Sequence, residues 1–258
     1  MTNNVYTLIT GGTKGIGLEL AKLFAKDKNN LILIARNEDE LKTAKNLLEN
    51  KYRVTVEILS LDLSVDNSVE KLIKFVEEKR LIVDNLINNA GVGSFGYFDE
   101  IQSEKDLKLI QVNIVALTKL NKYFLPKMKD RKTGGILNIA STAAFVGGPK
   151  MSTYYSSKAY VLTLSEALFE EGREFGVKVC CLCPGPVKTD FQESAGIIKS
   201  EKAKKYLMDA KDVAIEGYEG FRKRKAIIVP GFKNKVMVFS TKILPRSLIR
   251  KIILTTNK

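Results

Sequence analysis

Short apolar runs alternate with longer amphipathic stretches along the chain, and this pattern predicts strands that alternate with helices. Most of the apolar runs are nearly continuous, as is typical of strands whose two faces are both covered by helices. Such alternation indicates right-handed crossovers between parallel strands. We therefore expect a doubly wound α/β fold with a seven-stranded parallel sheet and helices on both faces. The expected strands are Val5–Thr10, Leu31–Ala35, Val54–Ser60, Asn85–Asn88, Gly135–Ala140, Val177–Cys183 and Ala226–Val229.

The amphipathic stretches repeat their apolar residues every three or four positions, the period of a helix that packs on one face. Between Phe191 and Asp209 neither period is strong, and we interpret that stretch as a flap over a site. The pattern predicts one domain over residues 1–232 and a basic amphipathic extension over residues 233–258. The expected helices lie near Gly15–Lys26, Glu38–Asn50, Val65–Lys79, Glu104–Lys129, Tyr154–Phe175 and Lys211–Lys225.

Composition narrows the classes of function. The chain of 258 residues is 45% hydrophobic and 28% charged, which is ordinary for one globular domain. It has no histidine, which excludes Ser-His-Asp triads and histidine-ligated zinc, and we expect no metal site. Cys180, Cys181 and Cys183 stand too close together for a zinc knuckle and are expected to be buried, reduced thiols. With no secretion leader and no apolar run of ~20 residues, we expect a cytoplasmic protein.

The net charge of +13 is concentrated near the end of the chain. No aspartate or glutamate follows Glu219, and residues 221–258 hold 11 lysines and arginines, whereas the first 220 residues hold 31 basic and 29 acidic residues. The body is therefore nearly neutral, which argues against a nucleic-acid partner. In the extension, one face of an expected helix over 245–254 is apolar. That face either packs on the body or a sister subunit, or it makes peripheral contact with an anionic membrane.

A glycine-rich turn follows the first expected strand and opens the first expected helix, with the sequence Thr-Gly-Gly-Thr-Lys-Gly-Ile-Gly from Thr10 to Gly17. Glycines permit a tight turn and the close approach of a pyrophosphate, which then meets free N–H groups at the helix start. The pattern predicts a dinucleotide-binding loop. The alternative is an ordinary glycine-rich turn.

Tyr154 and Lys158 are four residues apart, so they share one helical face, and Ser141 precedes the tyrosine by thirteen residues. A hydroxyl from a strand end beside these two groups could activate a carbonyl, and with a dinucleotide loop this indicates hydride transfer. Tyr155 faces about 100° away around the helix and has no lysine at its fourth position. Ser141 could alternatively belong to a simple strand-end turn.

Together these segments resemble the short-chain dehydrogenase/reductase superfamily, in the order and spacing of that family over about the first 190 residues. The resemblance implies a Rossmann-like fold, a nicotinamide cofactor and a catalytic tetrad of Asn113, Ser141, Tyr154 and Lys158. The matching segments are Thr10–Gly17, Leu61–Leu63, Asn88–Gly91, Asn113, Ser141, Tyr154 with Lys158, and Pro184–Thr189.

The same resemblance implies the cofactor contacts. Asp62 should receive the adenine amino group, although it could instead cap the next helix. Asn89 to Gly91 should border the adenosine ribose, and Thr189 should meet the nicotinamide carboxamide. The expected cofactor-binding residues are Gly11, Thr13, Lys14, Gly15, Ile16, Gly17, Arg36, Asp62, Leu63, Asn89, Ala90, Gly91, Tyr154, Lys158, Pro184, Gly185, Val187 and Thr189.

The choice of cofactor depends on charge at the end of the second expected strand. NAD-dependent members of the family usually place an aspartate there, whereas this chain has Ala35 followed by Arg36. An arginine can pair with a 2′-phosphate, and Lys14 could join it. We therefore expect NADP(H) rather than NAD(H), unless these two side chains are merely solvated surface charges.

In the implied mechanism, Tyr154 exchanges a proton with the substrate oxygen. Its pKa of about 10 must fall towards neutrality, and the ammonium of Lys158 beside an oxidised nicotinamide is the expected cause. Lys158 should also bind the nicotinamide ribose. Asn113 should support a water-linked proton path behind it, and Ser141 should hydrogen-bond the substrate oxygen.

The substrate is expected to be a small-molecule carbonyl or alcohol, and a lipophilic one, because the variable segments Val92–Phe98, Phe145–Ser152 and Phe191–Leu207 are rich in apolar residues. The family resemblance implies a homodimer or homotetramer paired through the helices over 104–129 and 154–175. The alternative functions are a non-catalytic NADP-binding regulatory module and a membrane-peripheral interaction protein. The apolar candidates are Phe95, Tyr97, Phe98, Phe145, Val146, Met151, Phe191 and Ile197.

Overall fold

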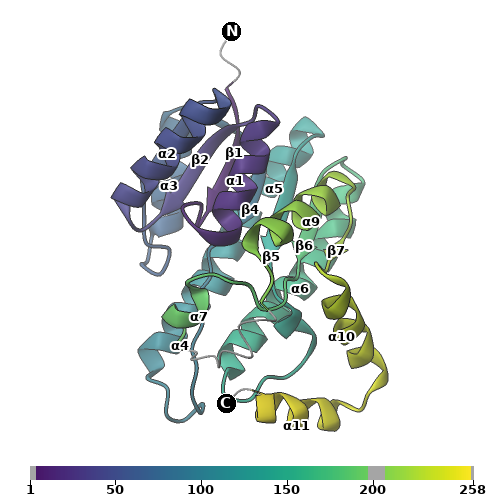
Figure 1. Ribbon diagram of the computed structural model, residues 1–258. Helices are drawn as coiled ribbons and strands as arrows, with labels where there is room; N and C mark the ends of the chain where they lie inside the picture. Colours follow the sequence, from purple (N-terminus) through teal and green to yellow (C-terminus); the bar gives the residue numbers. More distant parts are fainter. Residues whose placement is uncertain (1–3, 197–206, 257–258) are drawn as a thin grey trace.

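A parallel sheet of seven strands forms the centre of the protein (Figure 1), as expected. The structure is a computed structural model and describes residues 4–196 and 207–256. The strand order is β3-β2-β1-β4-β5-β6-β7, so the chain reverses its direction of travel across the sheet between β1 and β4. This reversal leaves a crevice at the carboxyl ends of the two strands, where doubly wound folds bind their ligands. The strands are β1 Val5–Thr10, β2 Asn30–Ala35, β3 Val56–Ser60, β4 Ile82–Asn88, β5 Gly135–Ile139, β6 Lys178–Leu182 and β7 Ile227–Ile228.

Helices cover both faces of the sheet (Figure 1) and bury its apolar side chains. Neighbouring residues of one strand serve opposite faces: Leu8 packs towards the α3 and α5 side, and Ile9 packs towards the α1, α2 and α9 side. Both side chains are fully buried, which explains why the strand is a continuous apolar run. One face carries α1 (Gly15–Lys26), α2 (Glu38–Tyr52) and α9 (Ala210–Arg222), and the other carries α3 (Ser68–Glu78), α5 (Leu117–Arg131) and α6 (Ser152–Arg173).

The expected strands and helices are present, with ends that differ by up to three residues. The largest difference within the body concerns the single helix expected over 104–129. It is divided into α4 (Ser103–Ile110), the π-helical turn η1 (Gln111–Ala116) and α5. A π-helical turn inserts an extra residue into the helical repeat and is frequent at functional sites. Here the turn contains Asn113, one of the four expected catalytic residues.

The three cysteines lie in or directly after β6 and are buried free thiols, as expected. Burial raises the pKa of Cys180 to about 12, which keeps the thiol protonated near neutral pH. The protonated thiol of Cys180 packs in the core as a small apolar side chain.

The end of the chain forms two helices, α10 (Phe232–Ile243) and α11 (Arg246–Thr256), which run along one side of the body (Figure 1). The sequence predicts only the second. Within residues 4–196 and 207–256, the helices are all too short or too polar to cross a membrane. Residues 257–258 of the expected extension lie outside the described part of the chain.

Candidate active site

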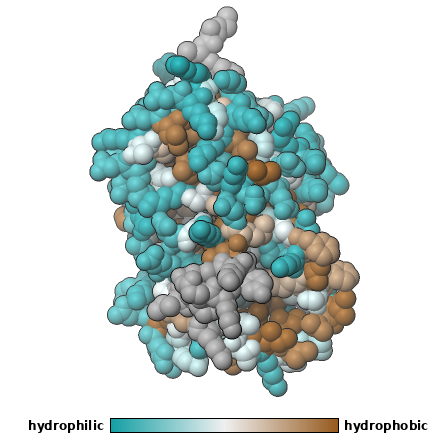
Figure 2. Space-filling view, viewed as in Figure 1, coloured by the Kyte–Doolittle hydropathy of each residue, from teal (hydrophilic) through white to brown (hydrophobic). Residues whose placement is uncertain are grey.

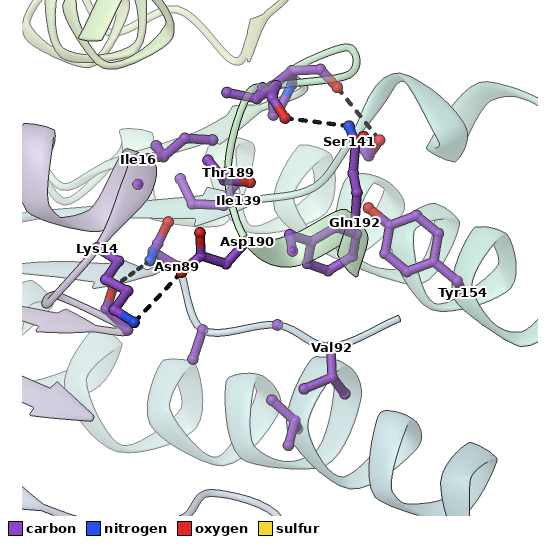
Figure 3. A pocket seen from close by; sticks show the side chains of 18 of the residues that line it. Lys14, Ile16, Asn89, Val92, Ile139, Ser141, Tyr154, Thr189, Asp190 and Gln192 are labelled. Atoms are coloured by element: carbon purple, nitrogen blue, oxygen red, sulfur yellow. Dashed lines mark hydrogen bonds and ion pairs between the residues drawn. The ribbon is translucent and has the colours of Figure 1, made fainter. Parts of the chain in front are cut away.

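A cavity of about 1310 Å³ opens at the carboxyl ends of the central strands (Figure 3). The loops after six strands line it: the glycine turn after β1, residues 36–37 after β2, residues 61–63 after β3, residues 89–92 after β4, Ser141 after β5, and residues 184–189 after β6. The cavity therefore lies at the switch point of the sheet. It brings together all the expected site residues except Gly17 and Asn113, which lie behind its wall.

The glycine turn requires its glycines for two different reasons. Gly11 and Gly15 have φ values of +65° and +52°, in the left-handed region. At Gly17 the limit is space, because a Cβ atom would lie 2.1 Å from the Gly11 carbonyl oxygen. Asn89 holds the turn from the other strand, since its side-chain nitrogen donates to the carbonyls of Thr10 (3.0 Å) and Gly11 (2.9 Å).

Charged side chains form the rim of the cavity near the end of β2. Arg36 lines the cavity, is exposed, and forms no ion pair within the described residues. Lys14 also lines it, but its Nζ lies 2.9 Å from Glu40 Oε1 and 3.4 Å from Asp190 Oδ2 (Figure 3). Lys14 thus pairs with two carboxylates beside the glycine turn. Neither carboxylate contact is apparent from the sequence.

Asp62 lines the cavity after β3 and is held by its own loop. Its Oδ1 accepts hydrogen bonds from the backbone N (2.9 Å) and Oγ (2.7 Å) of Ser64. Burial acts to raise the pKa of Asp62, but these hydrogen bonds and the charges of Lys108 and Arg36 outweigh it, so the pKa lies below its usual value. The carboxylate stabilises this turn six residues before α3 begins at Ser68, so it does not cap the helix directly.

Tyr154 and Lys158 face the cavity from α6, and Ser141 faces it from the turn between β5 and the short helix η2 (Thr142–Phe145). The Nζ of Lys158 lies 5.8 Å from the centre of the Tyr154 ring and donates to the carbonyl of Ile139 at 2.9 Å. The hydroxyl of Ser141 donates to the carbonyl of Pro184 at 3.3 Å. Three of the four expected catalytic residues therefore meet at one end of the cavity.

The pKa of Tyr154 moves in the direction opposite to the one expected from the sequence. Burial raises it to about 12, a hydrogen bond with Ser141 works against that rise, and the neighbouring Tyr155 adds to it. Burial also lowers the pKa of Lys158 to about 8. Among the protein's own groups, desolvation thus outweighs any stabilisation of the phenolate by the ammonium.

Asn113 lies behind the catalytic group and is buried. Its Oδ1 accepts from the backbone N of Val92 (2.9 Å), and its Nδ2 donates to the carbonyl of Val92 (3.0 Å) and to Ser157 Oγ (3.0 Å). A Cβ atom on Gly91 would lie 3.3 Å from Lys158 Nζ and 3.4 Å from Asn113 Oδ1. Asn113 therefore fixes the loop after β4 against the lysine.

The substrate side of the cavity is apolar. Of the expected residues, Phe95, Met151 and Phe191 line it, and the Phe191 ring lies 5.4 Å from that of Tyr154. Tyr97, Phe98, Phe145 and Val146 do not line it. The first two are exposed to solvent, Phe145 ends η2, and Val146 follows it. Ile197 lies outside the described residues. Lining residues that the sequence did not suggest include Asn37, Glu40, Lys108, Val112, Asp190 and Thr256, and also Tyr155, which was expected to face away from Tyr154.

Comparison with known proteins agrees with this geometry. The family model "short chain dehydrogenase" matches residues 6–197. The very-long-chain 3-oxoacyl-CoA reductase of Rattus norvegicus is 32% identical over 189 residues, which are 71% of this chain but 60% of the rat protein, so the match spans less than two thirds of that relative. Oxidoreductase UcpA of Escherichia coli K12 is 35% identical over 188 residues, 72% of this chain and 71% of its own length. A solved short-chain dehydrogenase from Sphingobium yanoikuyae in complex with NADPH is 32% identical, with a TM-score of 0.82 over 88% of both chains.

Proposed function

Because the chain belongs to the short-chain dehydrogenase family, we propose that it is an oxidoreductase that transfers hydride between NADP(H) and a carbonyl or alcohol substrate. The observation that carries the proposal is the single cavity that joins the glycine turn to Ser141, Tyr154 and Lys158. Hydride transfer requires the cofactor and the proton donor to meet the same substrate carbon–oxygen bond. One continuous volume with both sets of groups on its wall meets that requirement.

The residues of the glycine turn suit a dinucleotide. The start of α1 offers free N–H groups for a pyrophosphate, and the lack of a side chain at Gly15 leaves room beside Thr189, whose Cγ2 would lie 2.9 Å from a Cβ there. Thr13, Gly15 and Ile16 would hold the pyrophosphate. Asp62 would hold the adenine, and the loop after β4 the ribose. When bound, the nicotinamide supplies the hydride chemistry.

In the direction of reduction, Tyr154 is the proton donor. With a pKa of about 12 it is protonated near neutral pH and can donate to a carbonyl oxygen as negative charge develops there. Ser141 hydrogen-bonds the same oxygen and orients the carbonyl. Lys158, held near the Tyr154 ring, stabilises the phenolate left behind. Asn113 acts by holding the backbone at Val92 in place beside the lysine.

The rim of the cavity supports NADP(H) as the cofactor. Strand β2 ends at Ala35, so no carboxylate stands at its end to repel a 2′-phosphate, and the exposed Arg36 is available to bind one. Glu40 would repel the phosphate, and its ion pair with Lys14 weakens that repulsion. The Sphingobium yanoikuyae relative holds NADPH.

The apolar lining supports a lipophilic substrate. Phe95, Met151 and Phe191 offer contact area and no charge to an alkyl chain or ring system near Tyr154. The rat relative is named for very-long-chain 3-oxoacyl-CoA substrates, which is consistent with an elongated apolar group next to the reacting carbonyl.

The test is NADPH consumption by the purified protein with ketones, aldehydes and 3-oxoacyl compounds, with NADH in parallel. The wild type is expected to oxidise NADPH with at least one of these substrates. Tyr154→Phe removes the proton donor and keeps the ring, so turnover should fall by about a hundredfold or more. Binding of NADPH, measured by fluorescence titration, should remain within about threefold of the wild type, because the hydroxyl is not expected to carry much of that affinity.

Tyr160→Phe is the matched control. It removes a phenolic hydroxyl from the same helix, but that hydroxyl contacts Thr118 (2.8 Å) on the outer surface and does not reach the cavity. Turnover should be unchanged. Full activity of Tyr154→Phe would contradict the mechanism, and a wild type that binds NADPH without any turnover would indicate a non-catalytic binding module.

A further inference from the structure

We infer that the C-terminal arm, residues 232–256, docks the protein on the surface of an anionic phospholipid bilayer. The arm comprises α10 and α11, which lie along the body without adding to its sheet. The catalytic proposal does not require such an arm. Three observations carry the inference: an outward-facing apolar surface, a border of basic residues, and the position of the arm at the mouth of the cavity.

The apolar surface is formed first by α10. Phe232, Val236, Phe239 and Ile243, here named the outer stripe, have exposed fractions of 79%, 51%, 62% and 68%. Their spacing of four, three and four residues places them on one side of the helix. The opposite side, with the buried Val238, packs on the body. Helix α10 therefore exposes its apolar side to solvent, whereas a typical surface helix packs its apolar side on the body.

The apolar surface continues along α11. Ile249 is buried against the body, whereas Leu248 and Ile252 are 45% and 47% exposed on the adjacent side. Figure 2 shows hydrophobic residues gathered at the lower right of the molecule, where Figure 1 places α10 and α11. A contiguous apolar surface of this kind, absent from most of the remaining visible face, is typical of an interaction site.

The positive charges of the arm indicate which class of partner the apolar surface would bind. By their positions around the helix, Lys235 and Lys242 border one edge of the outer stripe and Lys233 borders the other. Lys235 also pairs with Glu216 of α9, at 3.3 Å. Arginines and lysines continue on α11, and no acid follows Glu219 in the sequence. Lipid headgroups of negative charge match this border, and lysine stems reach past an apolar stripe to such headgroups. In a dimer formed through the outer stripe, the lysines of one copy would face those of the other and repel them. We therefore infer a bilayer as the partner.

The arm also reaches the cavity. Thr256, near the end of α11, lines the cavity, and the Arg250 side chain lies against Gly147, 3.6 Å from where a Cβ atom would stand there. Helix α10 contacts η2, which directly follows Ser141. Docking through the arm would therefore bring the mouth of the cavity to the membrane surface. Under the proposed function, lipophilic substrate would then pass from the bilayer to Tyr154.

Flotation of the full-length protein with lipid vesicles tests the docking. The vesicles contain phosphatidylcholine alone or with about a third of phosphatidylglycerol. The wild type should bind the anionic vesicles at least about tenfold more strongly than the neutral ones, and added salt should weaken this binding. The double variant Phe239→Ser/Ile243→Ser should lose at least about tenfold of the binding, because both side chains are exposed and their loss leaves the packed side of α10 intact.

The matched control is Leu47→Ser/Val65→Ser, which removes two exposed apolar side chains, 43% and 53% exposed, outside the arm. It should bind vesicles as the wild type does. Equal vesicle binding by the stripe variant and the wild type would overturn the inference. A stripe variant that alters the molar mass measured by light scattering, with vesicle binding unchanged, would identify the stripe instead as an interface between copies.

Substrate delivery is tested separately, with a long-chain ketone dissolved in the vesicles and a short-chain homologue in water. The stripe variant should lose activity on the first and keep its activity on the second. Equal loss on both would overturn delivery from the bilayer. Failure of the wild type to reduce either ketone would count against the proposed function, and vesicle flotation would still decide the docking.

Discussion

Lys158 shows that the catalytic group is assembled at a cost to stability. Its side chain is only 5% exposed, and burial lowers its pKa from 10.5 to about 8. A depression of that size corresponds to about 3 kcal/mol of unfavourable burial while the lysine carries its proton. The hydrogen bond to the carbonyl of Ile139 offsets about 1 kcal/mol. A residue of this kind is retained for chemistry rather than for stability.

Lys158→Met should therefore raise the free energy of unfolding by about 1–3 kcal/mol at pH 7, while abolishing turnover. Below pH 8 the folded and unfolded wild type both hold the proton, so the full cost is present. Between about pH 8 and 10.5 the folded state loses the proton first, so the stability of the wild type rises with pH and the advantage of the variant shrinks. Urea denaturation at several pH values measures this. A variant less stable than the wild type at pH 7 would contradict it.

Arg36 carries the expected preference for NADP(H). Arg36→Ala should lower kcat/KM for NADPH by about tenfold to a hundredfold, because one charge-assisted contact to the 2′-phosphate is lost, and leave that for NADH nearly unchanged. Lys42→Ala is the control, since it removes a positive charge from the neighbouring helix α2 at a side chain that does not line the cavity. If both variants lowered kcat/KM for NADPH equally, the overall positive charge near the rim, and not a contact from Arg36, would be responsible for the preference.

At the level of residues, the sequence located the chemical groups better than their surroundings. Tyr154, Lys158 and Ser141 meet because helical spacing and a strand end fix them locally. The upward shift of the Tyr154 pKa depends on burial by distant segments, which no local pattern reports. Thr256 reaches the cavity only through the packing of α11.

At the level of elements, the sequence predicted the strands and helices whose apolar residues follow a regular, buried pattern. It missed α10 and η1, which do not show such a pattern. The bounds of β1 and α1 match the prediction, because a strand covered on both faces and a helix with one apolar side have clear periods. Helix α10 was missed because most of its large apolar side chains face outward. The π-helical turn η1 was missed because its six residues are too few to define a period of their own within a longer amphipathic stretch.

The glycine turn is an element whose geometry can be broken by one methyl group. Gly17→Ala would place a Cβ atom 2.1 Å from the Gly11 carbonyl oxygen and 2.5 Å from Asn89 Nδ2. We expect a loss of more than about 2 kcal/mol in the free energy of unfolding, together with weaker NADPH binding. Gly147→Ala is the control, because its methyl group meets only Arg250 side-chain atoms, the nearest at 3.6 Å. A neutral Gly17→Ala variant would show that the turn can relax.

At the level of the whole molecule, the strand order explains why the site could be placed before its contacts were known. Alternating strands and helices with short loops leave few topologies, and the doubly wound one puts its crevice at the carboxyl ends of the central strands. The topology alone then brings residues from the loops after β1, β4, β5 and β6 together at that crevice. The position of the C-terminal arm does not follow from this topology, because no strand pairing fixes it.

A paired assembly is expected through the adjacent helices α4, α5 and α6, where Leu107 and Tyr160 are exposed on the surface. Light scattering should give a mass of twice or four times 28.8 kDa. Thr163→Glu, at an exposed position of α6, should reduce that mass by placing charge in the interface, whereas Thr43→Glu on the exposed side of α2 should not. A wild-type mass of one chain would contradict the expectation.

The ion pair between Lys14 and Asp190 links the two loops that face each other across the rim of the cavity. Its two side chains are 58% and 76% exposed, and solvent and salt weaken such an exposed pair. Thermal motion would therefore break and re-form this contact readily. A dinucleotide could enter between the two loops while the ion pair is broken, and entry would then require no rearrangement of the body.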